Sequence, residues 1–254
     1  MKFLVLIPAR YESTRFPGKP LAKIGGEEMI VRVCRQVAKT GFPLAVATDN
    51  ESIADTVRKA GFNAVITASS HRSGTERVEE AYRKLNSDAD VVINVQGDEP
   101  FIDPEQVRLL AKIFEKRPET HIATLARPFN PEREIEALED PNLVKLVISE
   151  EGSALYFSRS VIPFVRNLPR RDWPEKCNFF THIGIYAYKA DVLREIVRLP
   201  ESPLEKAESL EQLRWLANGY RIGVEESDLP TIGIDTPADL EAAEKYLANL
   251  SENH

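Results

Sequence analysis

FLVLIPARYESTRFPGK, residues 3–19, joins an apolar run to a loop that carries three cations. The run Phe3 to Ile7 predicts a buried strand. Arg10, Arg15 and Lys19 follow among Pro, Ser and Gly rather than on a regular helix face. Two planar guanidinium groups and one ammonium group suit the several oxygens of a polyphosphate. A solvated basic loop would have the same composition, so the rest of the chain must decide.

Strand-like and helix-like segments alternate through the first hundred residues. Apolar runs predict strands at 3–7, 44–47, 64–66 and 91–95, and stripes at helical spacing lie between them, one through 30–38 and one through 78–85. Asn50 can cap the helix between residues 47 and 64, and Gly61 can close it. The alternation predicts an α/β fold with a Rossmann-like, mostly parallel central sheet and helices on both faces. Ligands bind such sheets at the carboxyl ends of the strands, where residues 8–19, 67–72 and 97–100 fall.

The pattern loosens from residue 120 onward. Strands are predicted at 122–126, 143–148, 154–158 and 183–188, with a long excursion over 160–181, one helix over about 204–218 and a last helix over 237–250. We find no linker, low-complexity segment or internal repeat. The sequence therefore predicts a single domain over 1–254, with a nucleotide-binding half to about residue 120 and an elaborated second half over 121–254.

Composition narrows the class of protein. The 254 residues are 43% hydrophobic and 29% charged, and 33 basic against 40 acidic residues give a net charge of −7, as expected for a soluble globular protein that does not bind nucleic acid. Pro8 and Arg10 interrupt the opening apolar run, and no later run reaches the roughly 18 residues of a membrane span, so we expect a cytoplasmic protein without membrane insertion. Cys34 and Cys177, without a CxxC motif, indicate free thiols.

Two aspartates stand where a metal could bind. Asp98 follows the apolar stretch VVINVQ, with Gly97 between them, and at the end of a buried strand it can hold Mg²⁺ or simply form a turn before Pro100. Asp235 precedes a helix that Thr236, Pro237 and Asp239 start with a capping-box pattern. Asp235 is thereby left free to act as a second metal ligand, although the local sequence alone indicates only a helix start.

Other polar groups have structural and functional interpretations of similar weight. In SSHRSGTER, Ser73 and Thr75 can cap a helix whose free N–H groups can donate to an anion or a carbonyl. Arg72 and Arg77 could equally be solvated. Along HIGIYAY, alternation puts His182, Gly184 and Tyr186 on one face, where they can contact a substrate or pair with each other in the core. A solvated helix face is the default interpretation of a further polar trio, Glu208, Glu211 and Gln212.

Eight blocks together resemble a known family. In chain order they are IPARYESTRFPGKPL, TDN, HRSGTERV, INVQGDEP, ALYFSR, HIGIYAY, SPLEKAESLEQLR and GIDTPADLE, spanning Met1 to about Tyr246. The chain is similar in these blocks to the sugar-activating nucleotidyltransferases, most closely to those that use CTP and an eight-carbon acid sugar. The resemblance implies transfer of CMP from CTP to 3-deoxy-D-manno-octulosonate (Kdo) for lipopolysaccharide synthesis, with pyrophosphate released. It also implies Mg²⁺ as cofactor and a homodimer that uses the second half.

The same resemblance assigns roles to residues. The implied catalytic set is Arg10, Arg15, Lys19, Asp98 and Asp235, of which the two aspartates would hold Mg²⁺. Further nucleotide contacts fall on Ala9, Ser13, Ser70, Arg72, Ser73, Gly74 and Gln96. The implied sugar site comprises Gln96, Arg159, His182, Tyr186, Glu211 and Gln212, with Arg77 a less certain member.

Rival functions lack part of this pattern. A cytidylyltransferase for sialic acid would differ in the sugar site, and HIGIYAY and LEQLR favour Kdo over sialic acid. The sequence does not decide between Kdo and amino-Kdo as the substrate. An enzyme that uses a sugar 1-phosphate usually has a glycine-rich opening, and a dinucleotide-dependent dehydrogenase needs GxGxxG after the first strand, where this chain has neither. A non-catalytic nucleotide-binding protein would share the fold and the cationic loop, but it need not keep both acids.

Overall fold

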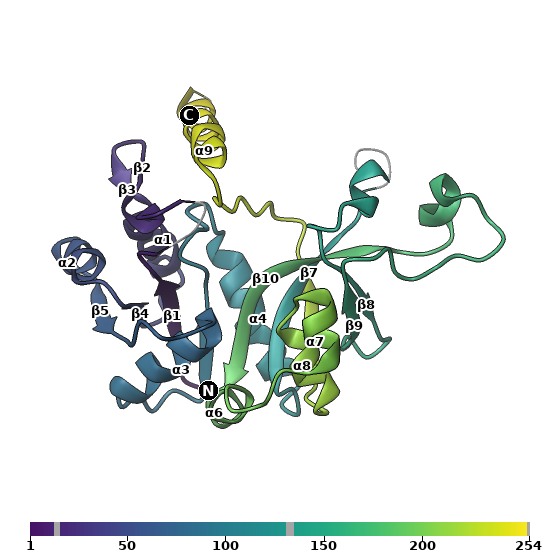
Figure 1. The fold of residues 1–254 in the computed structure, drawn as a ribbon, viewed down its shortest axis with the longest axis horizontal. Helices are drawn as coiled ribbons and strands as arrows, with labels where there is room; N and C mark the ends of the chain where they lie inside the picture. Colours follow the sequence, from purple (N-terminus) through teal and green to yellow (C-terminus); the bar gives the residue numbers. More distant parts are fainter. Residues whose placement is uncertain (13–15, 131–134, 253–254) are drawn as a thin grey trace. The chain divides into compact units, whose positions relative to one another are not determined.

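The computed structural model describes residues 1–12, 16–130 and 135–252 (Figure 1). The chain forms two compact units. The first comprises Met1–Arg108 and Pro230–His254, and the second comprises Leu109–Leu229. The sequence had placed everything after about residue 120 in one half, whereas residues 230–254 return to the first unit.

The first unit is built on parallel strands. Strand β1 (Phe3–Ala9) pairs with β4 (Leu44–Thr48) and β6 (Val91–Asn94), and β4 also pairs with β5 (Asn63–Ile66). Helices α1 (Met29–Ala38), α2 (Glu51–Lys59) and α3 (Gly74–Lys84) connect these strands. All four residues of β6 are buried, as expected for a strand that is covered on both faces. The predicted α/β class and mostly parallel sheet are confirmed.

Local capping explains where these helices begin. The Asn50 side chain accepts the backbone N–H groups of Ser52 at 2.9 Å and Ile53 at 3.2 Å, so the predicted cap of α2 is confirmed. Ser73 caps α3 through the N–H of Glu76 at 3.2 Å. The predicted stripe through residue 85 was one residue too long, because Leu85 lies just beyond α3 and is 36% exposed.

A second core binds the C-terminal helix to the first unit. The chain passes from the 3-10 helix η1 (Lys19–Leu21) through the short strands β2 (Lys23–Ile24) and β3 (Glu27–Glu28). Ile24 and Met29 pack with Ile234 and with Ala243 of α9 (Pro237–Glu252), and all four are fully buried. This cluster is why the segment after residue 230 belongs with the first unit.

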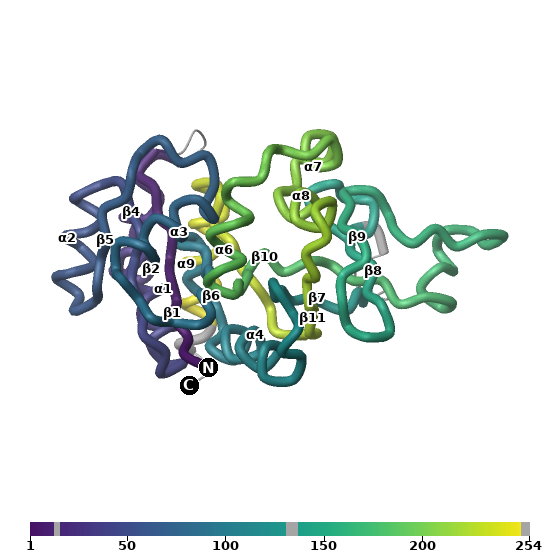
Figure 2. The backbone as a smooth tube through the Cα atoms, turned by 90° about the horizontal axis from the view of Figure 1, so that it is seen from below, coloured from purple at the N-terminus to yellow at the C-terminus, as the bar shows by residue number. Residues whose placement is uncertain are grey.

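The second unit is a mixed sheet. Strand β7 (Ile122–Pro128) pairs in parallel with β11 (Ile222–Glu226) and antiparallel with β10 (Phe180–Lys189). Strand β8 (Lys145–Ile148) pairs antiparallel with β10 and with β9 (Ala154–Ser158). The predicted excursion is the long loop that follows β9 in Figure 2, and it contains the 3-10 helix η3 (Arg170–Glu175). The unit also contains η2 (Ile135–Glu139) and α6 (Ala190–Ile196).

The predicted single helix over 204–218 was wrong. Two short helices, α7 (Pro203–Glu208) and α8 (Gln212–Ala217), replace it, because Ser209 adopts a left-handed conformation with φ 52° that ends α7. The sequence also did not anticipate α4 (Pro104–Lys116) or β11. No helix in the described parts of the chain is long and apolar enough to cross a membrane.

Candidate active site

The cationic loop, residues 8–19, begins at the carboxyl end of β1, and a backbone hydrogen bond joins Gly18 to Tyr11. Gly18 has φ 71°, a conformation that glycine adopts without strain, and its N–H donates to the Tyr11 carbonyl at 2.9 Å. This closure places Lys19 at the start of η1. Two of the predicted site residues, Ser13 and Arg15, lie outside the described residues.

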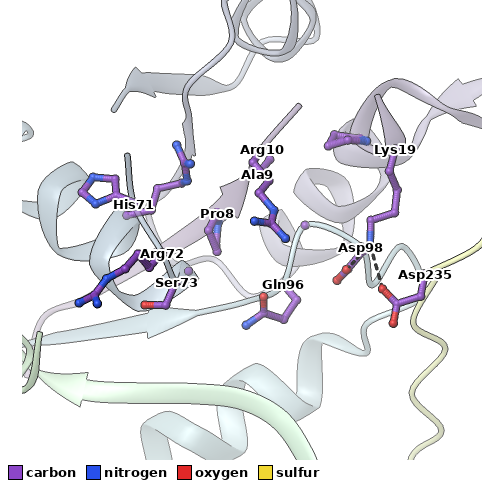
Figure 3. A pocket seen from close by; sticks show the side chains of 14 residues that line it. Pro8, Ala9, Arg10, Lys19, His71, Arg72, Ser73, Gln96, Asp98 and Asp235 are labelled. Carbon is purple, nitrogen blue, oxygen red and sulfur yellow. Dashed lines mark hydrogen bonds and ion pairs between the residues drawn. The ribbon is translucent and has the colours of Figure 1, made fainter. Parts of the chain in front are cut away.

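Lys19 contacts both predicted metal ligands. Its Nζ atom donates to Oδ2 of Asp98 at 2.6 Å and to Oδ1 of Asp235 at 3.2 Å (Figure 3). The lysine side chain is only 13% exposed, so this is a partly buried cation held by two carboxylates. The structure therefore brings together three predicted catalytic residues that are separated by up to 216 positions in the sequence.

Close backbone packing positions the two acids. A Cβ atom at Gly97 would lie 2.7 Å from the Pro8 carbonyl oxygen, so only glycine lets the end of β6 pack this tightly on the end of β1. The Asp98 carbonyl in turn accepts the N–H of Ile234 at 3.0 Å, which fixes the chain immediately before Asp235.

The helix start after Asp235 is the predicted capping box. Asp239 accepts the Thr236 N–H at 2.8 Å, and the Thr236 hydroxyl accepts the Asp239 N–H at 3.2 Å. Because Asp239 and Thr236 satisfy each other, the Asp235 carboxylate is left to bind Lys19.

The two acids fit a hard divalent cation. Their oxygens converge on one cationic atom, Lys19 Nζ, and carboxylate oxygens are the ligands that Mg²⁺ prefers. No cluster of three or more acidic, histidine or cysteine side chains suited to a metal occurs among the described residues. Asp98 and Asp235 would supply two carboxylate ligands to such an ion.

An open pocket of about 270 Å³ lies over these strand ends within the first unit. It is lined by Pro8, Ala9, Arg10, Lys19, Pro20, His71, Arg72, Ser73, Gly74, Arg77, Gln96, Gly97, Asp98 and Asp235. Figure 3 shows the segment that enters α3 at one end, Ala9, Arg10 and Gln96 in the middle, and Lys19 with the two acids at the other end. Such an elongated polar pocket, with cations along it and acids at one end, suits a nucleotide.

Two acids of α3 hold the entry segment, residues 67–74, in place. Glu80 accepts the Ala68 N–H at 2.8 Å, and Glu76 accepts the Arg72 N–H at 2.9 Å. Burial opposes the ionisation of Glu80, but hydrogen bonds from Lys84, the Ala68 amide and His71 outweigh it and lower the Glu80 pKa to about 2. The entry segment is thus fixed by charge-assisted hydrogen bonds.

Residues of the entry segment differ in how they meet the pocket. His71 contacts Glu80 through Nε2 at 2.5 Å and lines the pocket, yet it has no predicted role; its only sequence signal is its place beside Arg72. Ser70 is exposed and is not among the lining residues. Arg77 is 3% exposed, so the solvated alternative weighed for it was wrong, whereas the Arg72 side chain is 70% exposed and pairs with Glu76.

The remaining predicted sugar residues lie in the second unit. Arg159 follows β9, and its guanidinium donates to the carbonyls of Glu208 at 2.6 Å and Pro141 at 2.9 Å. The Glu208 carboxylate accepts the Ser158 hydroxyl at 2.6 Å and the Arg159 N–H at 2.8 Å, so the solvated interpretation of Glu208 was wrong. Gln212 is buried, at 6% exposed.

His182 and Tyr186 share a face of β10, as predicted, although the strand is irregular there. Two extra residues after Ile183 bulge from the pairing with β7, which preserves the shared face, and the two rings lie 5.3 Å apart. Nε2 of His182 contacts the Thr124 hydroxyl at 3.0 Å rather than Tyr186. Burial lowers the His182 pKa to about 3, so this imidazole is neutral at neutral pH.

The buried hydroxyl of Tyr186 differs from the His182 imidazole in its hydrogen bonding. Burial, followed by the charges of Tyr188 and Glu211, raises the Tyr186 pKa well above its usual value. Among the described residues, none makes a hydrogen bond of normal geometry to the Tyr186 hydroxyl. A buried, unpartnered hydroxyl is costly unless a ligand or water satisfies it.

A parallel α/β unit with a cationic pocket at its strand ends is typical of nucleotide-binding proteins. The family model described as Cytidylyltransferase matches residues 4–223, and the chain belongs to this family. Most of both units lies within the match.

Comparison with full-length relatives narrows the similarity to one kind of cytidylyltransferase. The chain is 53% identical over 251 residues to the 3-deoxy-manno-octulosonate cytidylyltransferase of Bacteroides thetaiotaomicron, covering 99% of this chain and 100% of the relative. It is 49% identical to the protein of the same name from Porphyromonas gingivalis, covering 96% of each chain. A solved CMP:2-keto-3-deoxy-manno-octonic acid synthetase in complex with CTP superposes with a TM-score of 0.90 at 40% identity, covering 98% of this chain and 99% of the other.

Proposed function

We propose that this chain transfers CMP from CTP to the anomeric hydroxyl of Kdo, giving CMP-Kdo and pyrophosphate. The observation that carries the proposal is a single polar pocket in which the entry segment, Arg10 and the group of Lys19, Asp98 and Asp235 follow one another, as the base, phosphates and metal of a nucleotide would. Full-length relatives near 50% identity that are named for this activity support it.

The cations of the pocket are proposed to hold the triphosphate. Arg10 and Lys19 line the pocket, and the first turn of α3, which Ser73 caps through the Glu76 N–H, would offer backbone donors to the base. The hydroxyl of Kdo attacks the α-phosphorus in line, the bond from that phosphorus to the bridging oxygen breaks, and the hydroxyl proton passes to solvent. Lys19 can neutralise the charge that grows on the departing pyrophosphate.

Asp98 and Asp235 are proposed to hold Mg²⁺. When bound, the ion would screen the phosphate charges and lower the pKa of the attacking hydroxyl, which makes a dedicated side-chain base unnecessary. Lys19, which now bridges the two acids, is then free to turn toward the phosphates.

The sugar is proposed to contact side chains of the second unit. A neutral His182 cannot form an ion pair with the Kdo carboxylate, so Arg159 is the better partner for that charge. The Tyr186 hydroxyl, buried without a partner among the described residues, is suited to a sugar hydroxyl. Glu211 and Gln212 complete the proposed set.

The test is pyrophosphate release from each of the four nucleoside triphosphates, combined in turn with Kdo, amino-Kdo, sialic acid and a hexose 1-phosphate, with Mg²⁺ and with EDTA. We expect release only with CTP, Kdo and Mg²⁺. Release with sialic acid or amino-Kdo instead would assign the other acid sugar. Absence of release in every combination would favour a non-catalytic nucleotide-binding protein.

We further propose a homodimer formed through the second unit and a cytoplasmic location. Phe164 and Leu155 of that unit are 75% and 61% exposed, and large exposed apolar side chains often mark a protein interface. CTP is made in the cytoplasm, which is where an enzyme of this kind would meet it. Light scattering coupled to gel filtration would test the oligomeric state, and fractionation of the producing cell would test the location.

A further inference from the structure

The carboxylate of Asp49 contacts two segments that border the nucleotide pocket. Asp49 stands directly after β4. Its Oδ2 atom accepts a guanidinium N–H of Arg77 at 2.7 Å, and its Oδ1 atom accepts the backbone N–H of Tyr11 in a longer contact of 3.4 Å. Tyr11 belongs to the cationic loop and Arg77 to α3, so one side chain ties these two parts together.

Arg77 extends this connection into the entry segment. It donates to the Thr67 hydroxyl at 2.7 Å and to the Ala68 carbonyl at 3.4 Å, and both residues lie at the start of that segment. The side chains of Arg77 and Asp49 are 4% and 12% exposed. A pair this buried is sensitive to loss of either charge, because the remaining charge is left without a partner.

We propose that Asp49 is a positioning residue for the nucleotide, acting through Arg77 to fix the cationic loop and the entry segment relative to each other. The inference rests on the proposed function and adds a residue to it. A nucleotide spans from its base to its phosphates, so the two contact regions must be held at a fixed separation, and misplacement of about 1 Å can cost about 100-fold in rate. The neutral amide of Asn has the same shape as the carboxylate but cannot hold the guanidinium by charge.

The experiment compares Asp49→Asn with the wild-type chain. We expect the KM for CTP and the Kd for CTP measured without sugar each to rise by about 10- to 100-fold. The preference for CTP over UTP should fall, and the KM for Kdo should stay within about twofold, because the contacts of Asp49 go to Arg77 and Tyr11 beside the nucleotide pocket. If Arg77 instead serves the sugar, Arg77→Met would raise the KM for Kdo, and that result would overturn the positioning role.

A matched control exists in the second unit. Arg214 and Glu205 form a pair of similar burial, at 8% and 12% exposed, with contacts of 2.7 and 2.5 Å. Glu205→Gln should lower the melting temperature about as much as Asp49→Asn, yet leave the Kd for CTP unchanged. An equal rise in the Kd for CTP in both variants would reduce the effect of Asp49 to general destabilisation and overturn the proposal.

A double-mutant cycle adds a readout that keeps the test decisive if Asp49→Asn folds poorly. Arg77→Met and the double variant with Asp49→Asn should bind CTP equally weakly, since the two residues act as one pair. Full additivity of the two losses would contradict the proposal. CTP binding is measured without Kdo, so it reports on Asp49 even if no sugar proves to be a substrate. Failure of the proposed function is recognised separately, by absence of turnover in the wild-type chain.

Discussion

At the scale of single residues, Lys19 is the side chain on which the proposed chemistry depends most directly. Its ammonium lies between Asp98 and Asp235, at 2.6 and 3.2 Å from their oxygens. It therefore lies where Mg²⁺ is proposed to bind. When Mg²⁺ binds the two acids, Lys19 is proposed to turn toward the phosphates. A lysine suits this movement because its charge is compact and its side chain is flexible, so the backbone need not move.

Lys19→Met should lower turnover by about 100- to 1000-fold, the usual cost of losing a donor that stabilises developing charge. The methionine keeps most of the side-chain volume, so we expect a melting temperature close to that of the wild-type chain. Pyrophosphate release at saturating CTP and Kdo measures the first effect, and thermal unfolding measures the second. Wild-type turnover in this variant would remove Lys19 from the mechanism.

At the scale of elements, α3 both supports the pocket and anchors the entry segment. Glu80 is a main anchor of the entry segment, because its carboxylate accepts hydrogen bonds from that segment and has a pKa of about 2. A pKa below that of the unfolded chain means that ionised Glu80 stabilises the fold above about pH 4.5, and that this stabilisation is lost as the pH falls toward 2.

Glu80→Gln should lower the free energy of unfolding by about 1–3 kcal/mol at pH 7, since buried donors lose a charged acceptor. The difference from the wild-type chain should shrink below pH 4.5 and nearly vanish near pH 2, where the protonated wild-type carboxyl resembles the amide. Chemical unfolding of both proteins at several pH values measures this difference in the free energy of unfolding. The control on the same helix is Glu79→Gln, whose partner Arg83 is exposed and 3.8 Å away, and which should change little at any pH. A gap between Glu80→Gln and wild type that does not vary with pH would contradict this account.

The elements that the sequence predicted share a strong local signal. Strand β1 is a continuous apolar run, and Asn50 provides a cap that needs no tertiary context. The break at Ser209 could not be predicted, because φ 52° there is a property of the folded backbone and the surrounding helical pattern continues across it. The same holds for the bulge in β10, which shifts register against a partner strand remote in sequence.

The residues of the candidate site also differ in whether the sequence alone can reveal them. Asp98, Asp235 and Lys19 carry recognisable patterns, and the structure brings them together. Asp49 and Glu80 act only through contacts that folding creates, over separations of 28 residues to Arg77 and 12 residues to Ala68. Polar residues of this supporting kind have no spacing rule that a single sequence displays.

At the scale of the whole molecule, the two units carry different parts of the proposed reaction. The lined pocket draws all of its residues from the first unit, and most of the predicted sugar residues belong to the second. The net charge of −7 also makes the local cations necessary, because both proposed substrates are anions and the protein as a whole repels them.

This division predicts that a change in the second unit alters the handling of the sugar without altering that of the nucleotide. Arg159→Met should raise the KM for Kdo at least about tenfold, because one charge-assisted pair is commonly worth about 1.5–3 kcal/mol. The Kd for CTP, measured by calorimetry without sugar, should stay within about twofold of the wild-type value. Lys206→Met on the neighbouring helix, whose side chain is 64% exposed, serves as the control and should change neither constant. Loss of CTP affinity in Arg159→Met as large as the loss for Kdo would instead mean that Arg159 serves both substrates.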